Sequence, residues 1–166
     1  MKYGRFEDLP VWKSGMELAV RVFALTARPI FRGSGSLRDQ IERATVSISS
    51  NIAEGFERGT TQELLTFLYI ARGSAGEVRS LLCLLERLPV FSDLISEISN
   101  SKSLAESISR QLRAWAESLQ ESEIKGQRYL TDRARWSTQA ARVRKEFLQR
   151  LEIIHKEHLS KSGKAS

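Results

Sequence analysis

Long segments without proline, each with apolar residues at helical spacing, constrain the fold of this chain more than any other feature. The only prolines among the 166 residues are Pro10, Pro29 and Pro89. Because proline interrupts the interior of a helix, the segments between and beyond these residues are free to form long helices. Alternation of polar and apolar residues with period two, which is typical of half-buried strands, does not extend far anywhere. The sequence therefore predicts an all-α protein.

Capping residues and loop signals divide most of the chain into four helices. We predict these helices at residues 8–28, 37–56, 60–88 and 92–119. Asp8 and Ser36 are the expected caps of the first two, and Thr60 with Glu63 forms a capping box for the third. The connections between them are short, and short connections favour antiparallel neighbours. The sequence thus predicts an up-down-up-down four-helix bundle.

Each predicted helix carries apolar residues that are expected to form the core. They are Trp12, Met16, Ala19, Val20 and Phe23 in the first; Ile41, Ala44, Ile48, Ile52, Ala53 and Phe56 in the second; and Leu94, Ile95, Ile98, Leu104, Ile108, Leu112, Trp115 and Leu119 in the fourth. The third is leucine-rich around Cys83, which we expect in the core. Gly73 and Gly76 interrupt it and cost about 1 kcal/mol each relative to alanine. We expect a closely packed neighbouring helix to offset that cost.

The positive charge of the chain is concentrated in its last part. The sequence has 26 Lys and Arg against 20 Asp and Glu, a net charge of +6. Residues 1–122 are balanced, so the excess lies in residues 123–166. This asymmetry predicts a neutral helical domain, residues 1–122, with a basic extension, residues 123–166, that binds an anionic partner.

The basic extension is expected to contain a fifth, amphipathic helix at residues 131–158. Its apolar residues, at helical spacing, are Trp136, Ala140, Val143, Phe147, Leu151 and Ile154. The guanidinium of arginine matches phosphate oxygens, so the arginine-rich part favours nucleic acid as the partner. The candidate nucleic-acid-binding residues are Lys125, Arg128, Arg133, Arg135, Arg142, Arg144, Lys145 and Arg150.

Other roles of this helix remain open at this point. Its apolar face can pack on a neighbouring subunit while its basic face binds nucleic acid, or the charge can serve solubility alone. A membrane surface is less favoured because the apolar arc is narrow. No apolar segment approaches the ~20 residues of a membrane span. The N-terminal residues lack the apolar core of a signal peptide, and we expect a cytoplasmic protein.

Candidate catalytic and metal-binding residues are few. Ser47 and Ser50 have no nearby histidine to activate them. His155 and His158, with Glu157 between them, are too few for a zinc site in a chain whose single cysteine is distant. We therefore expect no enzyme activity, no cofactor and no metal.

The second predicted helix has a polar face opposite its isoleucines. The residues of this face that we assign to a subunit interface are Arg43, Ser47, Asn51, Glu54 and Arg58. Asn and Ser form helices poorly unless they have a specific bonding role, which favours an interface over a solvated face. Catalysis is the least favoured of the three interpretations.

The second and third helices also carry a long family motif. Gln40 and Ile41 are followed by the run Arg43-Ala44-Thr45-Val46-Ser47-Ile48-Ser49-Ser50-Asn51-Ile52-Ala53-Glu54-Gly55 and by Arg58. Further matches are Phe6, Leu9, Val11, Trp12, Phe67, Leu68, Ile70, Ala71, Gly73, Ser74 and Glu77. Over about residues 5–120 the chain resembles the four-helix-bundle family encoded in 23S rRNA intervening sequences. That family is related to the accessory variability determinant proteins of diversity-generating retroelements.

The resemblance implies a homopentameric ring that binds nucleic acid and assists mobile elements. Together with the charge distribution it predicts a non-enzymatic RNA-binding accessory protein. Its expected partner is a structured RNA of a ribosomal intervening sequence, a group II intron or a retroelement, bound mainly through phosphates. DNA and a reverse transcriptase are further partners that the sequence leaves open. The alternative is a pentameric scaffold that docks a reverse transcriptase without binding nucleic acid.

Overall fold

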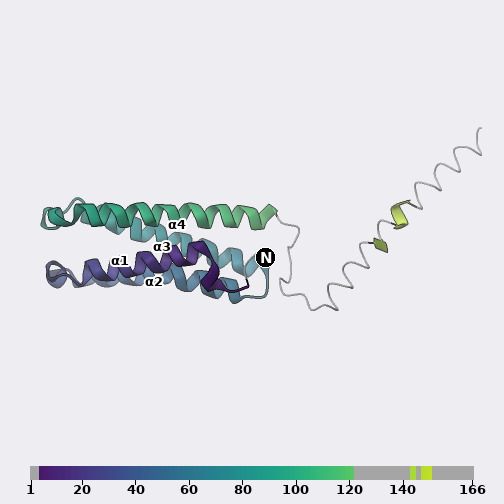
Figure 1. Cartoon of the computed structure of the whole chain (residues 1–166), viewed down its shortest axis with the longest axis horizontal. Coiled ribbons are helices and arrows are strands. Elements are labelled where there is room, and N and C mark those ends of the chain that lie inside the picture. Colours follow the sequence, from purple (N-terminus) through teal and green to yellow (C-terminus); the bar gives the residue numbers. More distant parts are fainter. Residues whose placement is uncertain (1–3, 122–142, 145–146, 151–166) are drawn as a thin grey trace, which may run out of the picture. The chain divides into compact units, whose positions relative to one another are not determined.

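The computed structural model describes residues 4–121, 143–144 and 147–150, and all their long regular elements are helices (Figure 1). The long helices are α1 (Pro10–Thr26), α2 (Gly35–Glu57), α3 (Thr61–Leu85) and α4 (Ile95–Glu121). Three short 3-10 helices are η1 (Phe6–Asp8), η2 (Pro29–Gly33) and η3 (Pro89–Leu94). The prediction of an all-α protein with four long helices is confirmed over this part of the chain. The chain divides into two units, residues 1–128 and 129–166.

The four long helices of the first unit pack as a bundle in which each contacts two others. α1 contacts α2 and α4, and α3 contacts the same two helices. α1 and α3 therefore lie at diagonally opposite corners. Contacts along α2 and α3 occur in reverse order: Gln40 Nε2 donates to Glu77 Oε1 at 3.1 Å, and the Ser47 and Ser74 hydroxyls lie 2.9 Å apart. These two helices are thus antiparallel neighbours.

The core of the bundle is formed from all four helices. Fully buried side chains include those of Leu18, Ile41, Ile48, Ile52, Leu64, Leu68, Leu82, Ile98, Ile108 and Leu112. The predicted apolar face of α2 is confirmed from Ile41 to Phe56, because its large apolar residues all lie on one side. Each side chain of this size contributes about 1.5–3 kcal/mol on burial. Apolar packing between helices is the main source of stability.

The predicted core face of α1 is wrong in part. Met16, Val20 and Phe23 are 40%, 67% and 45% exposed. Ala19 is buried and Trp12 packs against the core, as predicted. The other residues of α1 that enter the core are Val11, Leu18, Val22 and Leu25. α1 carries two neighbouring apolar stripes, and periodicity alone does not identify the one that faces the bundle. On α4, Ile95 is likewise 40% exposed, whereas most of the predicted stripe is buried or packed on the core.

Two predicted caps are wrong and one is confirmed. Asp8 belongs to η1, and Leu9 precedes α1 without a side-chain cap, while Pro10 occupies the first turn. Ser36 lies inside α2, which starts one residue earlier. Thr60 caps α3: the Glu63 amide donates to Thr60 Oγ1 at 3.2 Å, and the Thr60 hydroxyl donates to Glu63 Oε2 at 2.8 Å. Helix starts are thus best identified where two residues bond reciprocally.

Thr60→Ala is expected to lower the free energy of unfolding by about 1 kcal/mol, because it removes the acceptor of the Glu63 amide. Urea denaturation of both proteins measures the difference. Ser103→Ala, at an exposed position inside α4, is the control and is expected to be neutral or slightly stabilising. Equal effects of the two substitutions would contradict the capping role.

Among the glycines of the described residues, Gly55 lies closest to a neighbouring helix, and the prediction for Gly73 and Gly76 is wrong. A Cβ atom at Gly55 would lie 2.6 Å from Phe67 Cβ and 3.3 Å from Leu64 Cδ1. A Cβ atom at Gly73 or Gly76 would have no neighbour within 4 Å, because both residues lie on the outside of α3. The small residues of α3 that are buried are Ala71, Ser74 and Ala75. Cys83 is half-buried, so its placement in the core is also wrong.

In the second unit the described residues are few. Residues 143–144 and 147–150 are helical and exposed, and they fall within the predicted fifth helix. The rest of residues 131–158 lies outside the described part, so the fifth helix stays a prediction. No helix among the described residues has both the length and the apolar character that crossing a bilayer requires.

Candidate RNA and subunit interfaces

The middle of the predicted interface on α2 bonds within the protomer. Asn51 Nδ2 donates to the Ser47 carbonyl at 2.7 Å and to Ser47 Oγ at 2.9 Å. The Ser47 hydroxyl in turn shares a hydrogen bond with that of Ser74 on α3. All three side chains are buried or half-buried. They therefore join α2 to α3, and their assignment to a subunit interface stays a prediction.

The C-terminal end of this polar row forms a surface ion pair. Arg58 Nη2 donates to Glu54 Oε1 at 2.5 Å, and Arg58 Nη1 lies 3.9 Å from Glu63 Oε1. The Arg58 guanidinium also lies over the Phe67 ring, 5.2 Å from its centroid. The hydrogen bond to Glu54 raises the pKa of Arg58 above its ordinary value. The exposed pair fastens the end of α2 to the start of α3 but contributes little to stability.

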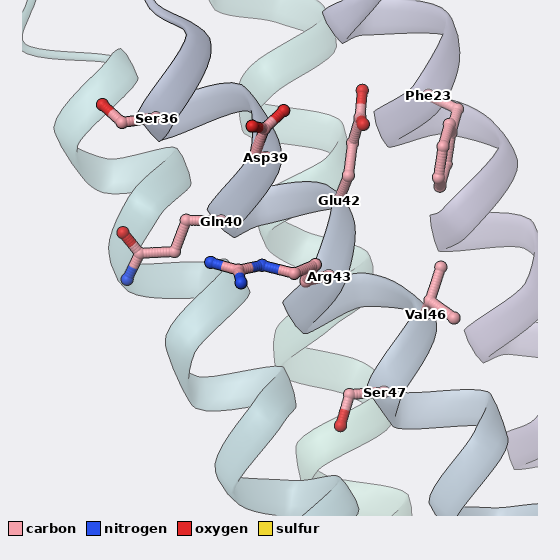
Figure 2. Close-up of a pocket in the computed structure, with 8 residues that line it drawn as sticks. All are labelled: Phe23, Ser36, Asp39, Gln40, Glu42, Arg43, Val46 and Ser47. Carbon is pink, nitrogen blue, oxygen red and sulfur yellow. The ribbon is translucent and has the colours of Figure 1, made fainter.

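Arg43, at the other end of the row, lines an open groove of about 850 Å³ on α2 and α1. The lining residues are Phe23, Ser36, Asp39, Gln40, Glu42, Arg43, Val46 and Ser47. Figure 2 shows Gln40 and Arg43 extending to one side of α2, with Phe23 and Val46 at the other side. Arg43 is exposed, and no described residue forms an ion pair with it.

The polar groups of this groove do not form a catalytic arrangement. The Thr26 hydroxyl donates to Glu42 Oε1 at 2.5 Å and Arg38 Nε donates to the same atom at 3.1 Å, so this carboxylate already has partners within the bundle. Among residues 4–121, 143–144 and 147–150, no three metal-ligating side chains come together. The groove offers an apolar floor and an arginine, which suit a contact with another macromolecule.

Most cations of the bundle are already paired with its own carboxylates. Ion pairs join Arg5, Arg21, Arg28, Arg38, Arg58, Lys102, Arg110 and Arg113 to glutamates. Arg28 Nη2 donates to both carboxylate oxygens of Glu97, at 2.7 and 2.8 Å, and so links the connection that follows α1 to α4. Eight of the 14 Lys and Arg in residues 4–121 are thus paired, which leaves six without an ion pair among the described residues.

The predicted nucleic-acid-binding residues are described at two positions. Arg144 and Arg150 are exposed and helical, and neither forms an ion pair with a described residue. The other six residues lie outside the described part: Lys125, Arg128, Arg133, Arg135, Arg142 and Lys145.

The sequence analysis missed the exposed apolar surface of the bundle. Met16, Val20 and Phe23 on α1 adjoin the groove through Phe23 and Val46. On α3, Tyr69, Ile70 and Leu84 are 44–46% exposed. In the sequence, this exposed surface is indicated by the two apolar stripes of α1, because a helix with one buried face needs only one such stripe.

Comparison with known proteins places the chain in a family. A model of the 23S rRNA-intervening sequence protein family matches residues 7–114. The crystal structure of a protein with unknown function from the S23 ribosomal protein family of Bacteroides thetaiotaomicron is similar in fold, with a TM-score of 0.57 and 23% identity. The similarity covers 64% of this chain and 98% of that one. No curated protein matches. Because the family match spans more than half of its length, the chain belongs to the 23S rRNA-intervening sequence protein family.

Proposed function

We propose that this protein is a non-enzymatic, homopentameric RNA-binding accessory protein that binds structured RNA mainly through phosphate contacts. The observation that carries the proposal is the separation of charge along the chain. The whole excess of +6 lies in residues 123–166, while most cations of the bundle are paired with its glutamates. Counterion release makes unpaired cations the main source of affinity for nucleic acid.

Assembly would multiply this charge. Five copies with +6 each would present a formal charge of +30 to one RNA. Several weak phosphate contacts on one assembly act at high effective concentration, so together they bind far more tightly than one segment does. The exposed apolar surfaces of the bundle support self-assembly, because contiguous apolar patches usually mark an interface. We also propose that the four helices of the bundle run in up-down-up-down order.

The proposed partner is an RNA of a mobile element. The family name connects the chain with intervening sequences of 23S rRNA, which supports an RNA-related role. We propose that this RNA belongs to a ribosomal intervening sequence, a group II intron or a retroelement. We also propose that the chain is related to the accessory proteins of retroelements. A cytoplasmic location is part of the proposal. Arg144 and Arg150 are exposed and suit phosphate contacts, which favours recognition of RNA shape.

A binding titration at several salt concentrations tests the function. For six or more phosphate contacts, we expect affinity for a structured RNA to fall about 10³-fold or more between 50 and 200 mM salt. Duplex DNA of the same length, titrated in parallel, measures whether the protein prefers RNA. Salt-independent or absent binding would contradict the proposal, and co-purification with a reverse transcriptase free of nucleic acid would favour the scaffold alternative.

A further inference from the structure

Two exposed apolar faces occur on the bundle, one on α1 and one on α3. The α1 face consists of Met16, Val20 and Phe23, which are 40–67% exposed. The α3 face consists of Ile70, Gly73, Glu77 and Leu84, which are all exposed and share one side of the helix. Neither face is covered by another described part of the bundle. Each leaves apolar side chains in water that a packed partner would remove.

The two faces lie on different helices, and each adjoins α2: Phe23 of the α1 face lines the groove with Val46, and Glu77 of the α3 face bonds to Gln40. α1 and α3 lie at opposite corners, since each contacts α2 and α4. A two-fold pairing of α1 faces would bury that face in two copies and leave both α3 faces in water. A contact of the α1 face with the α3 face of the next copy buries both faces of every protomer. Such head-to-tail contacts produce closed rings or open filaments.

The shapes of the two faces suit a close helix-to-helix contact. The α1 face presents three bulky side chains. On the α3 face, a Cβ atom at Gly73 would have no neighbour within 4 Å, so the surface next to Ile70 carries no side chain at this position and leaves the helix backbone accessible. An exposed glycine inside a helix costs about 1 kcal/mol relative to alanine. Nothing within the described protomer offsets this cost, whereas a bulky side chain of a second copy seated on Gly73 would do so.

The charges beside the faces are complementary. Lys13 on α1 is exposed and has no ion pair with a described residue. Glu77 on the α3 face accepts a hydrogen bond from the neutral amide of Gln40 at 3.1 Å and forms no ion pair with a described residue. Opposite charges on two patches orient their contact and disfavour self-pairing of either patch.

We propose that the α1 face of one copy packs on the α3 face of the next copy, with Val20 against Gly73 at its centre. This contact is the subunit interface of the assembly, and it rests on the self-assembly included in the proposed function.

Disulfide trapping tests the pairing. The double variant Val20→Cys with Gly73→Cys, in a Cys83→Ser background, is oxidised mildly and run on a non-reducing gel. We expect a ladder of covalent multimers that ends at the full assembly. An internal disulfide is excluded, because the two positions lie on opposite corners of the bundle and a disulfide needs Cα atoms within about 7 Å. Each single cysteine variant is expected to yield monomers.

Other outcomes overturn specific parts of the proposal. Covalent dimers from Val20→Cys alone would show two-fold pairing of α1 faces and overturn the head-to-tail contact. A protein that is multimeric by light scattering but yields no ladder would overturn the choice of faces and leave the proposed function standing. A monomeric wild-type protein would overturn both.

A second variant tests the contact without oxidation. Gly73→Arg adds a side chain into open space within the protomer, so the bundle should stay folded while the neighbouring copy is displaced. We expect the mass by light scattering to fall to that of the monomer, with an unchanged circular dichroism spectrum. Ser103→Arg, exposed on α4, is the matched control and should retain the full mass. A Gly73→Arg protein that retains the full mass would overturn the contact.

Discussion

The affinity of the protein for structured RNA is expected to fall about 100-fold or more when glutamine replaces the eight cations of the C-terminal segment. They are Lys125, Arg128, Arg133, Arg135, Arg142, Arg144, Lys145 and Arg150. Each phosphate contact that is lost also lowers the slope of log affinity against log salt by about one unit. The measurement is a titration of labelled RNA with both proteins at 50, 100 and 200 mM salt. The bundle lacks these residues, so its thermal unfolding should not change.

A matched pair of smaller variants separates position from total charge. One replaces Arg133, Arg135 and Arg142 by glutamine, and the other replaces three arginines of the bundle that have no ion pair among the described residues: Arg32, Arg72 and Arg79. Both lose the same charge. We expect the first to weaken binding and to reduce the salt slope, and the second to have a minor effect. Equal losses would mean that RNA binds the whole surface, and a larger loss in the bundle variant would contradict the role of the C-terminal segment.

Gly55→Val is expected to lower the free energy of unfolding by about 3 kcal/mol, the largest effect of a single substitution that we derive for the bundle. A Cβ atom at this position would lie 2.6 Å from Phe67 Cβ, which is bonded directly to the α3 backbone. Relief of this clash therefore requires α2 and α3 to move apart. Leu64 of α3 would then lose its contacts with α2. Urea denaturation, followed by circular dichroism, measures the loss.

The control for Gly55 is a glycine with free space around it. Gly76→Ala adds a methyl group where no atom lies within 4 Å, so the better helix propensity of alanine should raise the free energy of unfolding by about 1 kcal/mol. The two substitutions are thus expected to change the free energy of unfolding in opposite directions, although both replace a helical glycine. If Gly55→Val were as stable as the wild-type protein, the close approach of α2 and α3 at this point would be wrong.

Features of the fold that depend on neighbouring residues were predictable from the sequence. Prolines at three positions, the Thr60–Glu63 box and one-sided helices such as α2 identified four helices to within a few residues. These signals act over one or two turns, so they need no knowledge of the tertiary structure. Ile41, Ile48 and Ile52 were assigned to the core for the same reason, because they recur at helical spacing on one side of α2.

Features that depend on which side of a helix meets its neighbour were not predictable. α1 has two apolar stripes, and only packing with α2 and α4 selects Leu18 and Val22 over Val20. The surroundings of the glycines were not predictable for the same reason, since Gly55 packs against α3 while Gly73 is exposed. At the candidate interface, the polar row of α2 was recognisable, but the bonds of Ser47 and Asn51 within the protomer depend on the position of Ser74 on another helix.

The short connection between α2 and α3 has a consequence for the order in which the bundle forms. Only Arg58, Gly59 and Thr60 separate the two helices, so their contacts close small loops at low entropic cost. This helical hairpin is the natural nucleus of folding, since proteins with local contacts fold fastest. The bond between Arg28 and Glu97 spans 69 residues and belongs to the late docking of α1 against α4. Both helices of this hairpin precede α4 in the chain, so we expect the nucleus to form first during synthesis.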